Sequence, residues 1–163
     1  MIEPLDRESR ATRDDHLSVR LWLRMLSCAN LIEGRVARGL RESFDTTLPR
    51  FDFLSQLERA PAGLRMSEIS KRLMVTGGNV TRLTDQLLAD GMITRTPAPN
   101  DRRASIVRLT AHGRRTFAEM ARRHEAWIVE MFAGVRESER AQLYALLAKL
   151  KRRLVALESE ELR

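Results

Sequence analysis

The chain has 163 residues, a formal net charge of +7 and one cysteine. A single cysteine excludes an internal disulfide, and no apolar run approaches the ~20 residues needed to span a bilayer. The basic balance favours a polyanion such as nucleic acid as partner, with an anionic membrane surface as the competing interpretation. Because the first residues lack the apolar segment of a signal peptide, we expect a cytoplasmic protein with no membrane partner.

The first long element is a helix over residues 14–44, preceded by a charged, irregular arm over residues 1–13 that we expect to be flexible. Apolar side chains line one face of this helix and extend beyond it. The face carries Trp22, Met25, Ala29, Ile32, Val36 and Leu40, and Leu21, Leu23, Leu26 and Leu31 lie off it. A helix that is apolar on more than one side must bury more than one side. This pattern predicts a second subunit; the alternative is a larger core within one chain.

Two short helices follow. The first has Pro49 in its opening turn, where no N–H is needed, and an apolar face of Phe51, Leu54 and Leu57. The second is predicted to begin at Ser67, whose hydroxyl can cap the first turn, and it ends near Leu73.

The next helix is predicted over residues 76–90, with Thr76 as its cap and Gly91 as its stop. Its apolar stripe is Val80, Leu83 and Leu87. The opposite face carries Gly77, Gly78, Asn79, Thr81, Arg82 and Asp85. Glycines in a first turn each cost roughly 1 kcal/mol relative to alanine. We interpret them as allowing close approach to DNA phosphates; the alternative is a frayed turn.

A β-hairpin is predicted from Met92–Arg95 and Ser105–Leu109, which flank a turn region rich in proline. Its tip carries Asp101, Arg102 and Arg103, and a carboxylate beside arginines can orient a guanidinium for a minor groove. Two short helices and such a wing form a winged helix-turn-helix, so the fold is mainly α with a small β-hairpin. The predicted DNA-binding residues are Ser67, Thr76, Gly77, Gly78, Asn79, Thr81, Arg82, Asp101, Arg102 and Arg103.

Two further helices complete the chain, the first capped by Thr110 and ending near Ala133, the second over residues 137–157. The last helix has a heptad-like stripe, which is typical of a subunit interface. Its members are Leu143, Leu146, Leu147, Leu150, Leu154 and Leu157. Arg136 occupies the position where a Ser or Thr cap was expected, and the final six residues are predicted to fray.

The order Ser67…Leu73, Thr76–Asp90, Asn100-Asp-Arg-Arg103 and Arg108-Leu-Thr110 resembles the MarR (multiple antibiotic resistance regulator) family. The resemblance implies an intertwined helical homodimer that binds a pseudo-palindromic double-stranded DNA operator. It implies a winged domain over residues 47–110 and a dimerisation region over residues 14–46 and 111–163.

In that family, small molecules bind between the dimerisation helices and the winged lobe. The resemblance therefore implies a ligand-responsive regulator, acting as a repressor that its effector releases. The corresponding residues here are Arg20, Trp22, Arg24, Met25, Leu26, Arg50, Phe51 and Phe53. The alternative is that Trp22 and Phe51 are ordinary core residues. The segments Arg20–Arg24, Leu48–Asp52 and Leu73–Asn79 resemble a branch that regulates aromatic-acid degradation, which implies an aromatic acid or its coenzyme A thioester as effector.

Other chemistry has weaker support. Peroxide-sensing members of the family activate an early cysteine with tyrosines, but Cys28 has only the distant Tyr144. We therefore interpret Cys28 as a small packed residue and keep a redox-sensing regulator as an alternative. His16, His112 and His124 form no close pair, so neither a metal nor another cofactor is expected. No phosphate loop, nucleophile elbow or zinc-protease motif is present, which argues against an enzyme. A ligand-blind architectural DNA-binding protein is the remaining alternative.

Overall fold

The computed structural model describes residues 17–74, 76–99 and 101–161, and for residues 101–103 it describes the backbone only. The elements are α1 (Leu17–Phe44), α2 (Leu48–Glu58), β1 (Leu64–Arg65), α3 (Met66–Leu73), α4 (Gly77–Ala89), β2 (Ile93–Ala98), β3 (Asp101–Leu109), α5 (Ala111–Met131) and α6 (Glu137–Glu161). The predicted arm over residues 1–13, and His16, lie outside the described residues. The chain divides into two compact units, Met1–Trp127 and Ile128–Arg163.

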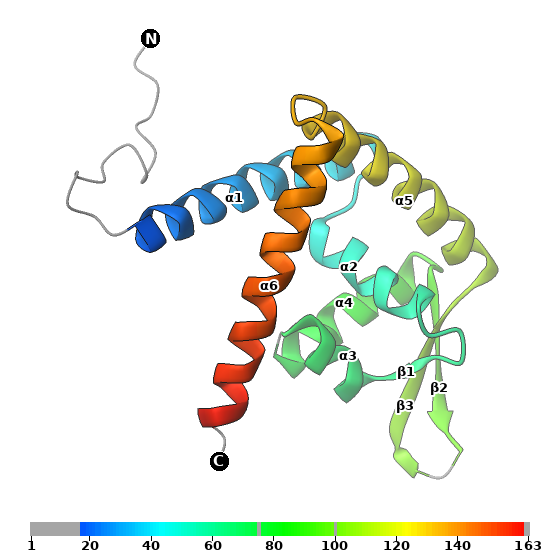
Figure 1. The fold of residues 1–163 in the computed structure, drawn as a ribbon. Coiled ribbons are helices and arrows are strands. Elements are labelled where there is room, and N and C mark those ends of the chain that lie inside the picture. The colour runs from blue at the N-terminus through cyan, green and yellow to red at the C-terminus, as the bar shows by residue number, and fades with distance from the viewer. Residues whose placement is uncertain (1–16, 75, 100, 162–163) are drawn as a thin grey trace. The chain divides into compact units, whose positions relative to one another are not determined.

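A winged lobe of α2, α3, α4 and a small sheet forms the core of the first unit (Figure 1). Each of its helices turns an apolar stripe inward, and the innermost side chains are fully buried. They are Phe53, Leu54, Leu57, Ile69, Val80, Leu87 and Val107, together with Leu40 from the end of α1. Burying one such side chain stabilises the fold by about 1.5–3 kcal/mol, so the lobe depends on this cluster.

The sheet has three antiparallel strands in the order β1-β3-β2. The predicted hairpin is present, but its strands are longer than predicted, running over Ile93–Ala98 and Asp101–Leu109. Its register pairs Ile93 with Leu109 and is irregular at Pro97/Ala98. The third strand, β1, was missed, because two residues are too few to show a period of two. Leu64 pairs with Val107, so β1 ties the start of α3 to the wing.

Hydroxyl caps begin α4 and α5 as predicted. The Thr76 Oγ1 accepts a hydrogen bond from the Asn79 N–H at 3.4 Å, and the Thr110 Oγ1 accepts one from the Gly113 N–H at 2.8 Å. Gly91 adopts a φ of +65° after α4, which is the left-handed stop that glycine favours. The predicted Ser67 cap is wrong: α3 begins at Met66, and the Glu68 carboxylate accepts a hydrogen bond from the Arg65 N–H at 2.7 Å. A side chain in the first turn has replaced the cap hydroxyl.

The start of α5 packs against the turn that links α4 to β2. The Thr110 hydroxyl lies 2.8 Å from the Gly91 carbonyl oxygen, to which it can donate, and the Thr110 N–H donates to the Met92 carbonyl at 3.0 Å. A Cβ at position 113 would overlap the Met92 carbonyl, whose carbon would lie only 2.8 Å away. Glycine is therefore required for this close approach of helix and turn.

The end of α1 belongs to the core, but its beginning is uncovered in the single chain. Val36 and Leu40 are buried, whereas Leu17, Leu21, Trp22 and Leu31 are more than half exposed. Of the apolar face predicted for this helix, only the last turns are thus buried within the chain.

Asp52 lies at the edge of the packing between α1, α2 and α5. The neighbouring Phe51 ring lies 5.4 Å from that of Phe117 and 5.0 Å from that of His124, measured between centroids. Partial burial raises the pKa of the Asp52 carboxyl above its ordinary value, while His124 lowers it and Glu33 raises it further. Because Asp52 is exposed at the surface of α2, solvent screens its charge, and charging it opposes folding only weakly.

The second unit contains α6, whose start was hard to place from sequence. Glu139 replaces the missing cap, because its carboxylate accepts a hydrogen bond from the Arg136 N–H at 2.9 Å. The prediction that the last six residues fray is wrong as far as Glu161, since α6 continues through that residue. An ion pair between Arg153 and Glu160, at 3.8 Å, supports this last part of the helix.

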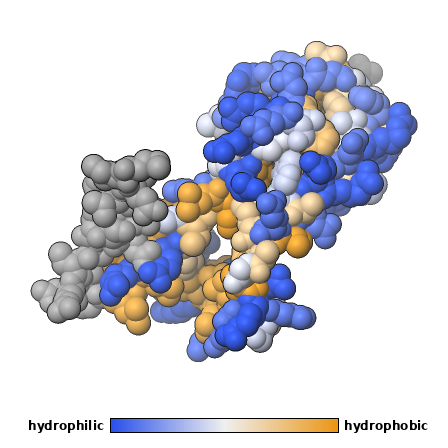
Figure 2. Space-filling model, turned by 90° about the horizontal axis from the view of Figure 1, so that it is seen from above, coloured by the Kyte–Doolittle hydropathy of each residue, from blue (hydrophilic) through white to orange (hydrophobic). Residues whose placement is uncertain are grey.

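The leucines of the α6 stripe are uncovered in the single chain: Leu143, Leu146, Leu147, Leu150, Leu154 and Leu157 are all at least 37% exposed. The space-filling view shows such apolar residues as orange areas at the surface (Figure 2). None of the described helices has both the length and the low charge that a membrane-spanning segment requires.

We predict that Gly113→Ala lowers the free energy of unfolding by about 1–3 kcal/mol, because the added methyl must push the start of α5 off the Met92 carbonyl. The matched control is Gly78→Ala in α4, where a Cβ would meet nothing within 4 Å; it should stabilise by about 0.5–1 kcal/mol. Urea unfolding at one fixed protein concentration measures both. Equal effects of the two substitutions would contradict the packing described here.

We predict that Asp52→Asn raises the melting temperature near neutral pH. A carboxyl with a raised pKa contributes stability below its unfolded-state pKa, and this contribution is lost as the pH rises through the folded-state value. Asparagine keeps the uncharged form at every pH. The gain over wild type should therefore be larger at about pH 7 than at about pH 4.5. Thermal unfolding followed by circular dichroism at both pH values tests this, and a gain that is larger at the lower pH would contradict it.

Candidate nucleic-acid interface

The outward face of α4 is polar, exposed and free of apolar side chains. Thr76, Gly77, Gly78, Asn79, Thr81 and Arg82 are all exposed. The inward face is buried, with Val80 at 1%, Leu83 at 6% and both Thr84 and Leu87 at 0% exposure. The helix therefore cannot rotate without exposing its stripe, and one set of side chains is held outward.

Hydrogen bonds along α4 order part of this outward face. The Arg82 guanidinium donates to the Asn79 side-chain oxygen at 3.4 Å, and the Thr81 hydroxyl donates to the Gly77 carbonyl at 3.0 Å. Asn79 and Arg82 are thus held as a pair one turn apart, and the guanidinium retains further donors. A paired amide and guanidinium are suited to acceptors on base edges or phosphates.

The two glycines at the start of α4 have no packing role among the residues that the structure describes. A Cβ at Gly77 or Gly78 would meet nothing within 4 Å, and neither residue has a positive φ. The fold therefore tolerates a side chain here. The bare backbone leaves the N–H groups of the helix N-terminus, which carry partial positive charge, open to an anion.

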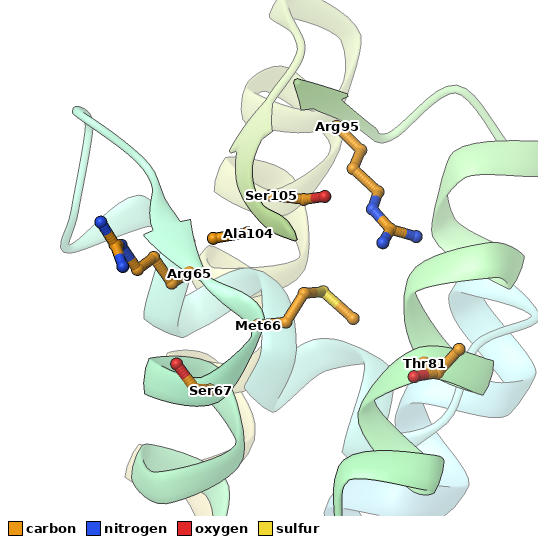
Figure 3. Close-up of a pocket in the computed structure, with 7 residues that line it drawn as sticks. All are labelled: Arg65, Met66, Ser67, Thr81, Arg95, Ala104 and Ser105. Atoms are coloured by element: carbon orange, nitrogen blue, oxygen red, sulfur yellow. The ribbon is translucent and has the colours of Figure 1, made fainter. Parts of the chain in front are cut away.

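A polar hollow of about 310 Å³ lies between the outward face of α4 and the sheet. It is lined by Arg65, Met66, Ser67, Thr81, Arg95, Ala104 and Ser105. Figure 3 shows the Arg95 side chain extending from the sheet toward the side where α4 carries Thr81, while Arg65 points away from it. The structure thus places Ser67 and Thr81 around the same hollow as the Arg95 side chain.

Arg65, Arg95 and Ser105 were not among the predicted site residues. The only sequence signal was a pair of arginines on predicted strand and loop segments, and β1 itself was not predicted. Pairing of β1 with β3 places Arg65 opposite Ile106 and brings the start of α3 next to the wing. Tertiary pairing, rather than a local motif, therefore assembles this hollow.

The wing carries further positive charge. The Arg108 guanidinium donates across the hairpin to the Thr96 hydroxyl at 3.1 Å. Asp101, Arg102 and Arg103 begin β3, but their side chains lie outside the described residues. The predicted orientation of an arginine by Asp101 therefore stays a prediction.

The residues predicted for an effector site differ from one another in burial. On α1, Arg20, Trp22 and Arg24 are exposed, and Met25 and Leu26 are half-buried. Phe53 is fully buried and Phe51 is 7% exposed, so both contribute to the core.

Arg50 forms an ion pair with Asp90 at the end of α4. It lines a cavity of about 300 Å³, whose other polar lining residues include Thr46, His112 and Thr116. Its Nε is buried without a hydrogen-bond partner among the described residues. Arg50 thus connects α2 to the end of α4, a contact that the sequence did not predict.

Cys28 and a metal site were the other candidates for chemistry. Cys28 is a free, exposed thiol on α1, so its interpretation as a packed residue is wrong for the single chain. Within the described part of the chain, no group of three or more His, Cys, Asp or Glu side chains is arranged to hold a metal ion.

Comparison with known proteins gives the family. The model of the MarR family matches residues 44–104. The HTH-type transcriptional regulator YdgJ of Bacillus subtilis is 31% identical over 110 residues, which cover 68% of this chain and 66% of that protein.

Two solved structures share the fold at higher coverage. A MarR family transcriptional regulator from Silicibacter pomeroyi matches with a TM-score of 0.74 and 28% identity, covering 88% of this chain and 99% of that one. Streptococcus pneumoniae FabT in complex with DNA matches with a TM-score of 0.72 and 29% identity, covering 86% and 99%. With an exposed polar helix, a basic hollow and a wing in place, we conclude that this chain belongs to the MarR family and is a DNA-binding transcriptional regulator, not an enzyme.

Proposed function

We propose that the chain is a ligand-responsive repressor that binds a pseudo-palindromic operator as a homodimer and is released by an aromatic acid or its coenzyme A thioester. The observation that carries the proposal is the outward face of α4. It is polar, presents Arg82 and is bare at its N-terminus, and no part of the described chain covers it. Such a face is suited to a major groove.

In the proposed complex, Asn79, Thr81 and Arg82 contact bases or phosphates. Gly77 and Gly78 let the backbone approach a phosphate. Arg95 adds a phosphate contact between α4 and the sheet, supported by its direction in Figure 3. Arg103, with Asp101 and Arg102 beside it, reaches the neighbouring minor groove.

The proposed dimer is supported by apolar surface that the single chain leaves exposed on α1 and, independently, on α6. We assign residues 14–46 and 111–163 to dimerisation and residues 47–110 to DNA binding. A two-fold dimer presents two copies of α4 to half-sites about 34–36 Å apart. As a regulator of transcription in a bacterial-type family, the protein is proposed to act in the cytoplasm.

The proposed effector site uses Arg20 and Arg24 for the anionic group and Trp22, Met25 and Leu26 as apolar lining from α1, together with Arg50, Phe51 and Phe53 from α2. An effector shifts the dimer away from its DNA-binding shape only by its differential affinity for the two shapes.

We predict that Arg95→Ala weakens operator binding and lowers the slope of log affinity against log salt by roughly 1 per protomer, since one phosphate contact is lost. The matched control is Arg59→Ala, which removes an exposed arginine at the end of α2, outside the proposed interface. Fluorescence anisotropy at several salt concentrations measures both, and sedimentation checks that the variants stay dimeric. If both variants show the wild-type slope, Arg95 does not contact a phosphate.

We predict that 4-hydroxycinnamate or its coenzyme A thioester releases the protein from operator DNA and raises its melting temperature when DNA is absent. A gel shift and a thermal-shift series with both compounds test this. Arg24→Ala should require a higher effector concentration for release while binding DNA as wild type does. If neither compound alters either measurement, the ligand-blind interpretation replaces the proposal.

A further inference from the structure

Met74 is exposed in a way that neither the fold nor the proposed dimer explains. It is 94% exposed, more than any other large apolar side chain in the described part of the chain. The other exposed large apolar residues of this part all belong to α1, α5 and α6. Those helices form the proposed dimerisation region, whereas Met74 lies in the winged lobe and needs a different partner.

The backbone at Met74 is also unfavourable for this residue type. Met74 ends α3 with φ 53° and ψ 37°, in the left-handed region. Glycine or asparagine is the usual residue there, because a Cβ in this conformation crowds the following carbonyl. Methionine at this position therefore costs conformational free energy, and its exposed side chain gains no burial that would offset this cost. An outlier of this kind points to a role outside folding.

The place of Met74 in the chain identifies its neighbour. It lies two residues before Thr76, which caps α4, and its N–H donates to the Lys71 carbonyl at 3.4 Å. Met74 therefore lies on the turn that leads into the outward face of α4. A partner that binds at the N-terminal end of this face therefore lies close in the chain to the exposed Met74 side chain.

The chemistry of the Met74 side chain limits which group on DNA it can contact favourably. A thioether has no charge for a phosphate and no strong donor or acceptor for a base edge. The apolar group that a major groove presents is the C5 methyl of thymine. An unbranched side chain with three rotatable bonds can adapt to such a methyl from the edge of the groove.

We propose that Met74 is a specificity-determining residue that contacts the C5 methyl of one thymine in each operator half-site. The inference rests on the proposed function, because it requires α4 to lie in a major groove. It adds a base preference at a position outside the recognition helix.

The DNA probe comes from a binding selection, in which the full-length protein enriches the duplexes that it binds from a pool of random 30-base-pair sequences. Each thymine of the selected site is then replaced singly by deoxyuridine, which removes only the methyl. At one position of each half-site, replacing thymine by deoxyuridine should weaken wild-type binding about fourfold. This is the loss expected for one buried methyl. Met74→Ala should bind the thymine and deoxyuridine duplexes equally, and Met74→Leu should retain most of the difference.

The outcomes separate this inference from the function on which it rests. If no sequence is enriched, the proposed operator binding fails and this inference fails with it. If a site is enriched but Met74→Ala shows the same loss on deoxyuridine as wild type, another residue contacts the methyl and only this inference is overturned. The same holds if no deoxyuridine weakens wild-type binding. Met74→Gly should melt no lower than wild type, and a lower melting temperature would show that Met74 acts through folding.

Discussion

The surface of this protein depends on the burial of one stripe of α4. Val80, Leu83 and Leu87 are inserted into the winged lobe, and Thr84 joins them because its hydroxyl is satisfied by the Val80 carbonyl at 2.8 Å. Rotating the helix by one residue, about 100°, would expose this stripe and bury polar groups without partners. The inner face of α4 therefore determines which side chains point outward, and the outer face is free to carry function.

A second constraint holds the two ends of α4 in place. At its beginning Thr76 caps the helix, and at its end Gly91 turns the chain into the wing. Thr110 bonds to this turn and caps α5, so one hydroxyl joins the end of α4, the sheet and the next long helix. The Arg50–Asp90 ion pair adds a link from α2 to the same end. A change in the spacing of α1, α2 and α5 would reach α4 through these contacts.

The exposed residues divide by chemistry into surfaces with different partners. Leucines on α6 and apolar residues on the first half of α1 are suited to another helix. Glycines, amides and arginines on α4 and β2 are suited to a polyanion. Met74 belongs to the winged lobe but has the chemistry of the first group, which is why an apolar group on DNA is its proposed partner.

The sequence by itself determined the helices, the Thr76 and Thr110 caps and the inward stripe of α4, because these depend on periods of 3.6 residues and on side chains three or four positions apart. It also identified the wing, although not the full length of its strands. Only the tertiary structure decided the third strand, the hollow with Arg65 and Arg95, the Arg50–Asp90 pair and the exposure of Met74. Each of these depends on residues far apart in the chain or on what covers a side chain. Local periodicity contains no information about such contacts, since they arise only when the core brings distant segments together.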